Sequence, residues 1–137
     1  MSTILLVEDE LSLRSVLSEY LTFSGYQVVA AAGGAEALER ARSSAIDVVV
    51  SDVLMPGIDG LELCKRFRAD PALAPIPFLF VTARNVDERL NATLTEIGDG
   101  IILKPFEPAR LLALIAAALA EGGSASGRRS ERARPAP

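Results

Sequence analysis

Residues 48–60 read Val48-Val49-Val50-Ser51-Asp52-Val53-Leu54-Met55-Pro56-Gly57-Ile58-Asp59-Gly60. Their first part belongs to a β-branched apolar run, which begins at Ile46 and ends at Val50. Their second part, after Asp52, is a loop with Pro56 and Gly57. Such a short run predicts a strand buried on both faces, as in a parallel sheet. Asp52 would then lie at the carboxyl end of that strand, where open α/β sheets bind ligands. Taken alone, Asp52 could instead be a turn-forming residue, so the rest of the chain has to decide.

Strands and helices alternate along the whole chain. Apolar runs predict strands at 3–7, 27–31, 46–50, 78–81 and 101–103. Helical spacing predicts helices near 13–21, 35–42, 60–68, 86–96 and 108–120. The first helix would use Leu13, Val16, Leu17, Tyr20 and Leu21 as its apolar face and stop at Gly25. This alternation predicts an α/β fold, a doubly wound parallel sheet of five strands with helices on both faces.

Length and composition favour one folded domain with an acidic body. The chain has 137 residues, half of them hydrophobic, which is enough for a real core. We expect a domain over 1–121, followed by a disordered tail over 122–137 that is rich in Gly, Ser, Arg and Pro. The formal net charge is −4, and the tail carries four arginines, so the excess of acid lies in the body. An acidic body argues against nucleic-acid binding by this domain.

Residue types that are absent or rare in the sequence exclude several classes of function. There is no histidine, which excludes Ser-His and Cys-His catalysis and most zinc sites. The single cysteine, Cys64, cannot form an internal disulfide and fits a reducing cytoplasm, where we expect it to be a small half-buried hydrophobe. Acidic residues 8–10 interrupt the first apolar stretch, so no signal peptide is expected, and no run is long enough for a membrane span. We expect a cytoplasmic protein.

Polar residues follow four of the five predicted strands. Glu8 and Asp9 follow the first, Asp52 follows the third, and Thr82 and Lys104 follow the fourth and fifth. Each alone could be a loop residue or a helix cap. Because all the strands point the same way, these side chains should meet at one edge of the sheet. The sequence therefore predicts a site there.

The chemistry of that site follows from its charges. Three carboxylates packed together repel one another and call for a hard cation, and Mg²⁺ suits oxygen ligands of this kind. Asp52 is the only plausible nucleophile and would form an aspartyl phosphate. Lys104 would balance the phosphoryl charge and Thr82 would donate a hydrogen bond to it, while small Ala83 leaves room for its oxygens. Lys104 could also be a plain structural ion pair with Asp52.

These residues resemble the receiver domain of two-component response regulators, in particular a single-domain receiver of the chemotaxis-regulator type. The resemblance covers about residues 2–120. It rests on Glu8-Asp9, Gly25-Tyr26, Glu36-Ala37-Leu38, Asp52 with Met55-Pro56-Gly57 and Asp59-Gly60, Thr82-Ala83, and Lys104-Pro105-Phe106. Each motif is weak alone, but together, in this order and spacing, they are highly specific.

The resemblance implies more than the residues show by themselves. It implies a flavodoxin-like fold with strand order 2-1-3-4-5 and a cis Lys104-Pro105 peptide. It implies that Asp52 accepts a phosphoryl group from a sensor histidine kinase or a histidine phosphotransfer protein. Mg²⁺ would be held by Asp9, Asp52 and the Leu54 carbonyl, with Glu8 reaching it through water. The chain would be a switch rather than an enzyme, catalysing only its own phosphotransfer and dephosphorylation.

Two departures affect how such a switch would signal. The family usually has an aromatic residue three positions before the lysine, which turns inward as the threonine moves. Here that position is Ile101, so the relay from Thr82 to the outer face is expected to be weaker or differently built. Residues 97–100 also match the family only loosely. Arg84, two residues beyond Thr82, could screen the phosphoryl group from water or be an ordinary surface residue.

Two rival functions and one candidate surface remain. A receiver-like interaction module that no longer depends on phosphorylation is one rival, although Asp52, Thr82 and Lys104 are all present. A true hydrolase or nucleotide-binding enzyme is the other, but the second acid of an Asp-x-Asp motif is absent after Asp52 and no phosphate-binding glycine motif occurs.

The last helix is apolar all round, and Leu114, Ala117 and Ala118 are expected to face outward as a homodimer or partner surface. Alanine also favours helix, which explains an exposed alanine-rich face equally well.

Overall fold

The computed structural model describes residues 1–83 and 87–121. Arg84 and the tail expected over 122–137 lie outside the described residues. Within the described part, none of the helices combines the length and the apolar character that a membrane crossing requires.

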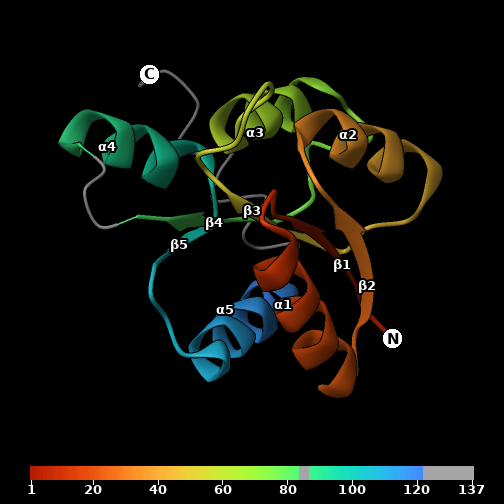
Figure 1. Ribbon diagram of the computed structural model, residues 1–137. Coiled ribbons are helices and arrows are strands. Elements are labelled where there is room, and N and C mark those ends of the chain that lie inside the picture. The colour runs from red at the N-terminus through yellow and green to blue at the C-terminus, as the bar shows by residue number, and fades with distance from the viewer. Residues whose placement is uncertain (84–86, 122–137) are drawn as a thin grey trace.

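A parallel sheet of five strands forms the centre of the molecule (Figure 1). The strands are β1 (Thr3–Val7), β2 (Gln27–Ala31), β3 (Val48–Asp52), β4 (Phe78–Thr82) and β5 (Gly100–Leu103). They are ordered β2-β1-β3-β4-β5, which confirms the predicted flavodoxin-like topology. The order reverses between β1 and β3, and this is the point where such sheets open a crevice for a ligand.

Five helices cover the sheet in two layers. They are α1 (Leu11–Phe23), α2 (Gly34–Ser43), α3 (Gly60–Ala69), α4 (Glu88–Ile97) and α5 (Pro108–Ala120). Figure 1 shows α1 and α5 on one face and α2, α3 and α4 on the other. The helices therefore lie on both faces, as predicted.

Strand β3 is buried along its whole length because both of its faces are covered. Val48 and Val50 pack into the core beneath α1 and α5, whereas Val49 points into the core beneath α2, α3 and α4. The strand begins and ends two residues later than predicted, so Asp52 is its last residue and does not lie two residues beyond its end. The carboxylate therefore extends from a rigid, fully paired strand.

Helix ends follow local capping chemistry. Gly25 has a φ of +103° just after α1, which is the left-handed conformation that a glycine stop supplies. The Asp59 carboxylate accepts a hydrogen bond from the Glu62 N–H at 2.8 Å and starts α3. Asp87 caps α4 in the same way through the Leu90 N–H at 2.7 Å, so α4 begins at Glu88 rather than at 86.

Two side chains are placed differently from the prediction. Val16 is 59% exposed, so the apolar face assigned to α1 was too wide. Cys64 is fully buried in α3 rather than half-buried.

The outward placement of Ala118 on α5 is also wrong. Leu111, Ile115 and Ala118 form the buried stripe of this helix, and Ala118 is only 8% exposed. Leu114 is half-buried and Ala117 is exposed, so two of the three residues assigned to the outer surface remain candidates. The error arises because a helix that is apolar all round gives no sequence signal for its rotation about its axis.

Candidate functional site

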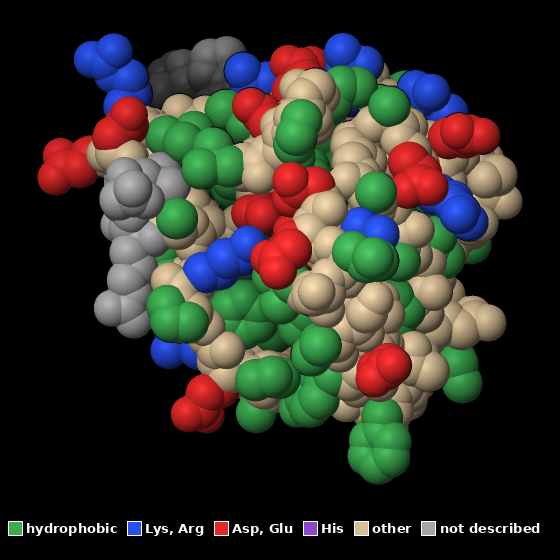
Figure 2. All heavy atoms as spheres, viewed as in Figure 1, with side chains coloured by type: hydrophobic (Ala, Val, Ile, Leu, Met, Phe, Trp, Pro, Cys, Tyr) green, Lys and Arg blue, Asp and Glu red, His purple; other side chains and the backbone are tan. Residues whose placement is uncertain are grey.

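The carboxyl ends of the strands bring the predicted residues together. Glu8 and Asp9 follow β1, Asp52 ends β3, Thr82 ends β4 and Lys104 follows β5. In Figure 2 acidic side chains gather near the middle of the visible face, with a basic side chain beside them. The four strand ends thus contribute to one site, as the topology required.

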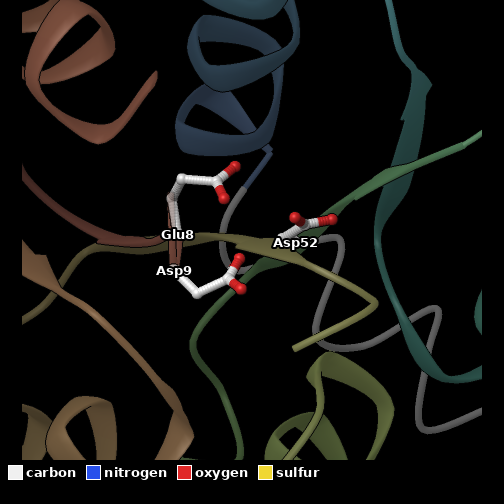
Figure 3. Close-up of side chains that lie close together, drawn as sticks. All are labelled: Glu8, Asp9 and Asp52. Atoms are coloured by element: carbon white, nitrogen blue, oxygen red, sulfur yellow. The ribbon is translucent and has the colours of Figure 1, made fainter. Parts of the chain in front are cut away.

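Three carboxylates converge within this site. One oxygen from each of Glu8, Asp9 and Asp52 lies within 4.8 Å of the others. Figure 3 shows the side chains of Glu8 and Asp9 reaching from neighbouring positions toward Asp52. Glu8 and Asp52 are buried and Asp9 is exposed. Three hard oxygen donors around one point fit a Mg²⁺ ion, which keeps part of its water shell and therefore needs an open side.

Glu8 is the most enclosed of the three acids. It is 3% exposed, and one carboxylate oxygen accepts the Glu10 N–H at 3.1 Å. Burial raises the pKa of the Glu8 carboxyl above its usual range, and the charge of Asp52 adds to the rise, although the Glu10 N–H and the Lys104 charge oppose it. Negative charge on Glu8 is therefore unfavourable, and a bound cation would offset that cost.

Lys104 is shared between two of the acids. Its Nζ lies 3.0 Å from Asp52 Oδ2 and 3.3 Å from Glu8 Oε1. Partial burial by itself lowers the pKa of Lys104, but the hydrogen bond and charge of Asp52, with those of Glu8, outweigh it, so the pKa is raised. Lys104 is thus a firmly held cation beside the carboxylate of Asp52. Its peptide bond to Pro105 is cis, as expected.

The loop after Asp52 is anchored at both ends. The Val53 N–H bonds to the Val81 carbonyl at 3.0 Å, and the Gly60 N–H bonds to the Val53 carbonyl at 2.8 Å. A Cβ at Gly60 would collide with the carbonyl oxygen of Asp52, so only glycine allows α3 to start this close to the strand. Leu54, in this loop, is 62% exposed.

Thr82 ends the strand next to Asp52, and Ala83 follows it. Asp52 pairs with Val81 in the sheet, so Thr82 is one residue further along the neighbouring strand. Thr82 is buried, and its hydroxyl makes only a long 3.5 Å contact with the Ala83 carbonyl, which leaves it available to a stronger acceptor. The Lys104 N–H bonds to the Thr82 carbonyl at 2.8 Å and links the ends of β4 and β5.

Ile101 occupies the predicted relay position in β5. It pairs with Phe80 of β4, is half-buried, and packs against the core beneath α2, α3 and α4. It also lines two surface grooves beside α4, of about 330 and 660 Å³. Ile101 therefore lies between the strand that carries Thr82 and the outer face of the molecule.

One residue of the site was not singled out from the sequence. The Arg14 guanidinium on α1 donates hydrogen bonds to the main-chain carbonyls of Glu8 at 2.8 Å and Asp9 at 3.5 Å. The available signal was a cation on the first helix, five residues after Asp9. Sequence alone could not show that it bonds to carbonyls rather than to the carboxylates.

Comparison with known proteins agrees with this geometry. Residues 4–116 match the family described as the response regulator receiver domain. The transcriptional regulatory protein AfsQ1 of Streptomyces coelicolor is 38% identical over 89% of this chain and 53% of its own length. The transcriptional regulatory protein PhoP of Bacillus subtilis, for alkaline phosphatase synthesis, is 40% identical over 96% of this chain and 51% of its own length. The chain thus spans about half the length of these curated relatives.

Solved structures give the same result. The chemotaxis protein CheY4 of Vibrio cholerae superposes with a TM-score of 0.79 at 32% identity, covering 85% of this chain and 98% of that one. The signal receiver domain of a signal transduction histidine kinase from Syntrophus aciditrophicus gives 0.81 at 31% identity, covering 88% and 91%. Receiver domains of this kind are signalling switches that pair with histidine kinases. The chain therefore belongs to the response regulator receiver domain family of two-component signal transduction.

Proposed function

We propose that this chain accepts a phosphoryl group from phosphohistidine on Asp52 and that the modified site changes how the chain binds a partner. One observation carries the proposal. Asp52 ends a fully buried strand with its carboxylate 3.0 Å from the Lys104 ammonium and within 4.8 Å of two further acids. A nucleophile, a fixed cation and a candidate ion site thus meet at one carboxylate.

The residues would divide the reaction among them. An Asp52 oxygen bonds to phosphorus while the bond from phosphorus to the donor imidazole breaks, and the electron pair stays on the imidazole nitrogen. Lys104 is placed to neutralise charge on the transferred group, because it already lies beside the attacking carboxylate. The Thr82 hydroxyl and the main chain at Ala83 would donate hydrogen bonds to the phosphoryl oxygens.

The acidic cluster would hold Mg²⁺. Asp9, Asp52 and the Leu54 carbonyl would be its ligands, with Glu8 acting through water. When bound, Mg²⁺ offsets the repulsion between the acids and the incoming phosphoryl group. The chain would turn over no external substrate: it would catalyse only its own phosphorylation and dephosphorylation. The donor would be a sensor histidine kinase or a histidine phosphotransfer protein.

Acetyl phosphate, a small-molecule donor, tests this function without knowledge of the kinase. With Mg²⁺ present, intact-protein mass spectrometry should show a gain of one phosphoryl group, and a chelator should prevent it. The reason is that three carboxylates cannot accommodate a phosphoryl dianion without a cation. No gain with Mg²⁺ in excess would contradict the proposal and favour an interaction module independent of phosphorylation.

The surface formed by Leu114 and Ala117 is proposed as the contact with a second copy of the chain. These residues line a groove of about 330 Å³ together with Thr95 of α4 and Ile101. The exposed small side chain of Ala117 allows another helix to approach closely. Because Ile101 replaces an aromatic ring, we expect the coupling between phosphorylation and this surface to be weak.

Ala117→Glu should weaken self-association by about tenfold or more, because a buried unpaired carboxylate is strongly unfavourable at an interface. Sedimentation equilibrium with and without beryllofluoride, a phosphoryl mimic, measures this. The control is Ala116→Glu, which is also exposed but does not line the groove. Equal association of both variants, or a monomeric wild type at high concentration, would contradict the proposed surface.

A further inference from the structure

Arg14 contacts every residue of the turn that carries two of the acids. We call residues 8–10 the acidic turn. The Arg14 guanidinium donates to the carbonyls of Glu8 and Asp9, at 2.8 and 3.5 Å. Its main-chain N–H donates to the Glu10 carbonyl at 3.0 Å. That last bond is the ordinary i to i−4 bond of a helix, so the Arg14 side chain itself holds the carbonyls of Glu8 and Asp9.

Although Arg14 lies beside three acids, its guanidinium binds main-chain carbonyls and not carboxylates. Within residues 1–83 and 87–121, Arg14 makes no ion pair with a carboxylate. The carboxylates of Glu8 and Asp9 point toward Asp52 instead (Figure 3). A guanidinium that binds the carbonyls does not occupy the carboxylate oxygens, and it fixes the peptide planes from which those side chains extend.

The acidic turn has little other support on the side of α1. Glu10 is the N-cap of this helix but makes no side-chain capping hydrogen bond, and the first turn of α1 holds no acid. The Glu8 N–H donates to the Ala31 carbonyl of β2, whereas the carbonyl of exposed Asp9 accepts a hydrogen bond from Arg14. Arg14 therefore joins the acidic turn to α1 through the carbonyls of the turn, in addition to the main-chain bonds of the helix.

We propose that Arg14 is a positioning residue for Mg²⁺: it orients Glu8 and Asp9 by holding their main-chain carbonyls. The inference rests on the proposed function, because it requires that the acids bind the ion. Groups that hydrogen-bond behind metal ligands set the orientation of those ligands, and their loss lowers metal affinity.

The sign of the effect separates positioning from simple charge. A fixed positive charge near the cluster repels Mg²⁺, so removing the charge alone should strengthen Mg²⁺ binding. Removing the hydrogen bonds should weaken it. Arg14→Lys keeps the charge but loses Nη1, the one nitrogen that makes both hydrogen bonds, because an ammonium is a point charge with different reach. The two variants together therefore distinguish the explanations.

Calorimetric titration with Mg²⁺ alone, on the full chain, is the test. Arg14→Gln and Arg14→Lys should each bind Mg²⁺ about tenfold more weakly than wild type, the lower end for partners of metal ligands. The control is Arg42→Gln, which removes one exposed positive charge from α2 and should stay within about twofold. Amide spectra should place the shift differences of Arg14→Lys at Glu8, Asp9 and Asp52.

Each outcome decides the inference. Unchanged or tighter binding by Arg14→Gln, or wild-type affinity in Arg14→Lys, would overturn it and leave only a charge effect. Urea unfolding without metal identifies a variant that is not folded, and Arg14→Lys decides alone if Arg14→Gln fails to fold. If wild type itself binds no Mg²⁺, the proposed function fails, which is a different result from equal binding by all variants.

Discussion

Asp52→Asn is expected to gain no acyl phosphate under conditions in which the wild-type chain is labelled by acetyl phosphate and Mg²⁺. An amide oxygen is a far weaker nucleophile than a carboxylate, and the variant also loses one of the three negative charges at the candidate ion site. The loss should therefore be complete rather than partial. Intact-protein mass spectrometry measures the gain, and release by hydroxylamine identifies it as an acyl phosphate.

Asp59→Asn is the matched control for this experiment. It removes one negative charge from the same loop, and Asn caps a helix about as well as Asp, so α3 should still begin at Gly60. Asp59 bonds to the Glu62 N–H and is not among the three converging acids. Its labelling should match that of wild type. Hydroxylamine-sensitive labelling of Asp52→Asn, or loss of labelling in Asp59→Asn, would show that the nucleophile is misassigned.

The fold and the assembly of the site could be predicted because both depend on strong, local signals. The run that leads to Asp52 could only be a short doubly buried strand, and alternation with helices fixed the direction of every strand. Parallel direction alone then placed Asp9, Thr82 and Lys104 beside Asp52. The shift of β3 by two residues did not matter, since it moved Asp52 from just beyond the strand to its last position.

What could not be predicted depends on contacts between distant elements. The rotation of α5, which buries Ala118, is set by the core beneath α1 and α5 and not by its uniform apolar sequence. The sequence suggests an ion pair of Lys104 with Asp52 alone, but in the structure Lys104 also contacts buried Glu8. The Arg14 contacts are made to main-chain carbonyls, for which the residue types give no signal.

Lys104→Met is expected to lower the free energy of unfolding by about 2 kcal/mol without divalent ions, between the values for exposed and fully buried ion pairs. Lys104 contacts Asp52 at 3.0 Å and Glu8 at 3.3 Å, and both acids are buried. Without the ammonium, the two carboxylates face each other with no described cation within ion-pair distance. Methionine keeps most of the side-chain volume, so the change tests charge rather than packing. Urea unfolding measures the loss.

Mg²⁺ should restore most of that stability, because the ion replaces the missing positive charge among the same carboxylates. The loss should also shrink when Lys104→Met is made in Asp52→Asn, since one of the two uncompensated charges is then gone. Lys65→Met, on the exposed side of α3, is the control and should change stability by less than about 0.5 kcal/mol. A loss that is the same with and without Mg²⁺, and the same in the Asp52→Asn background, would mean that Lys104 contributes packing and is not the counter-charge of this site.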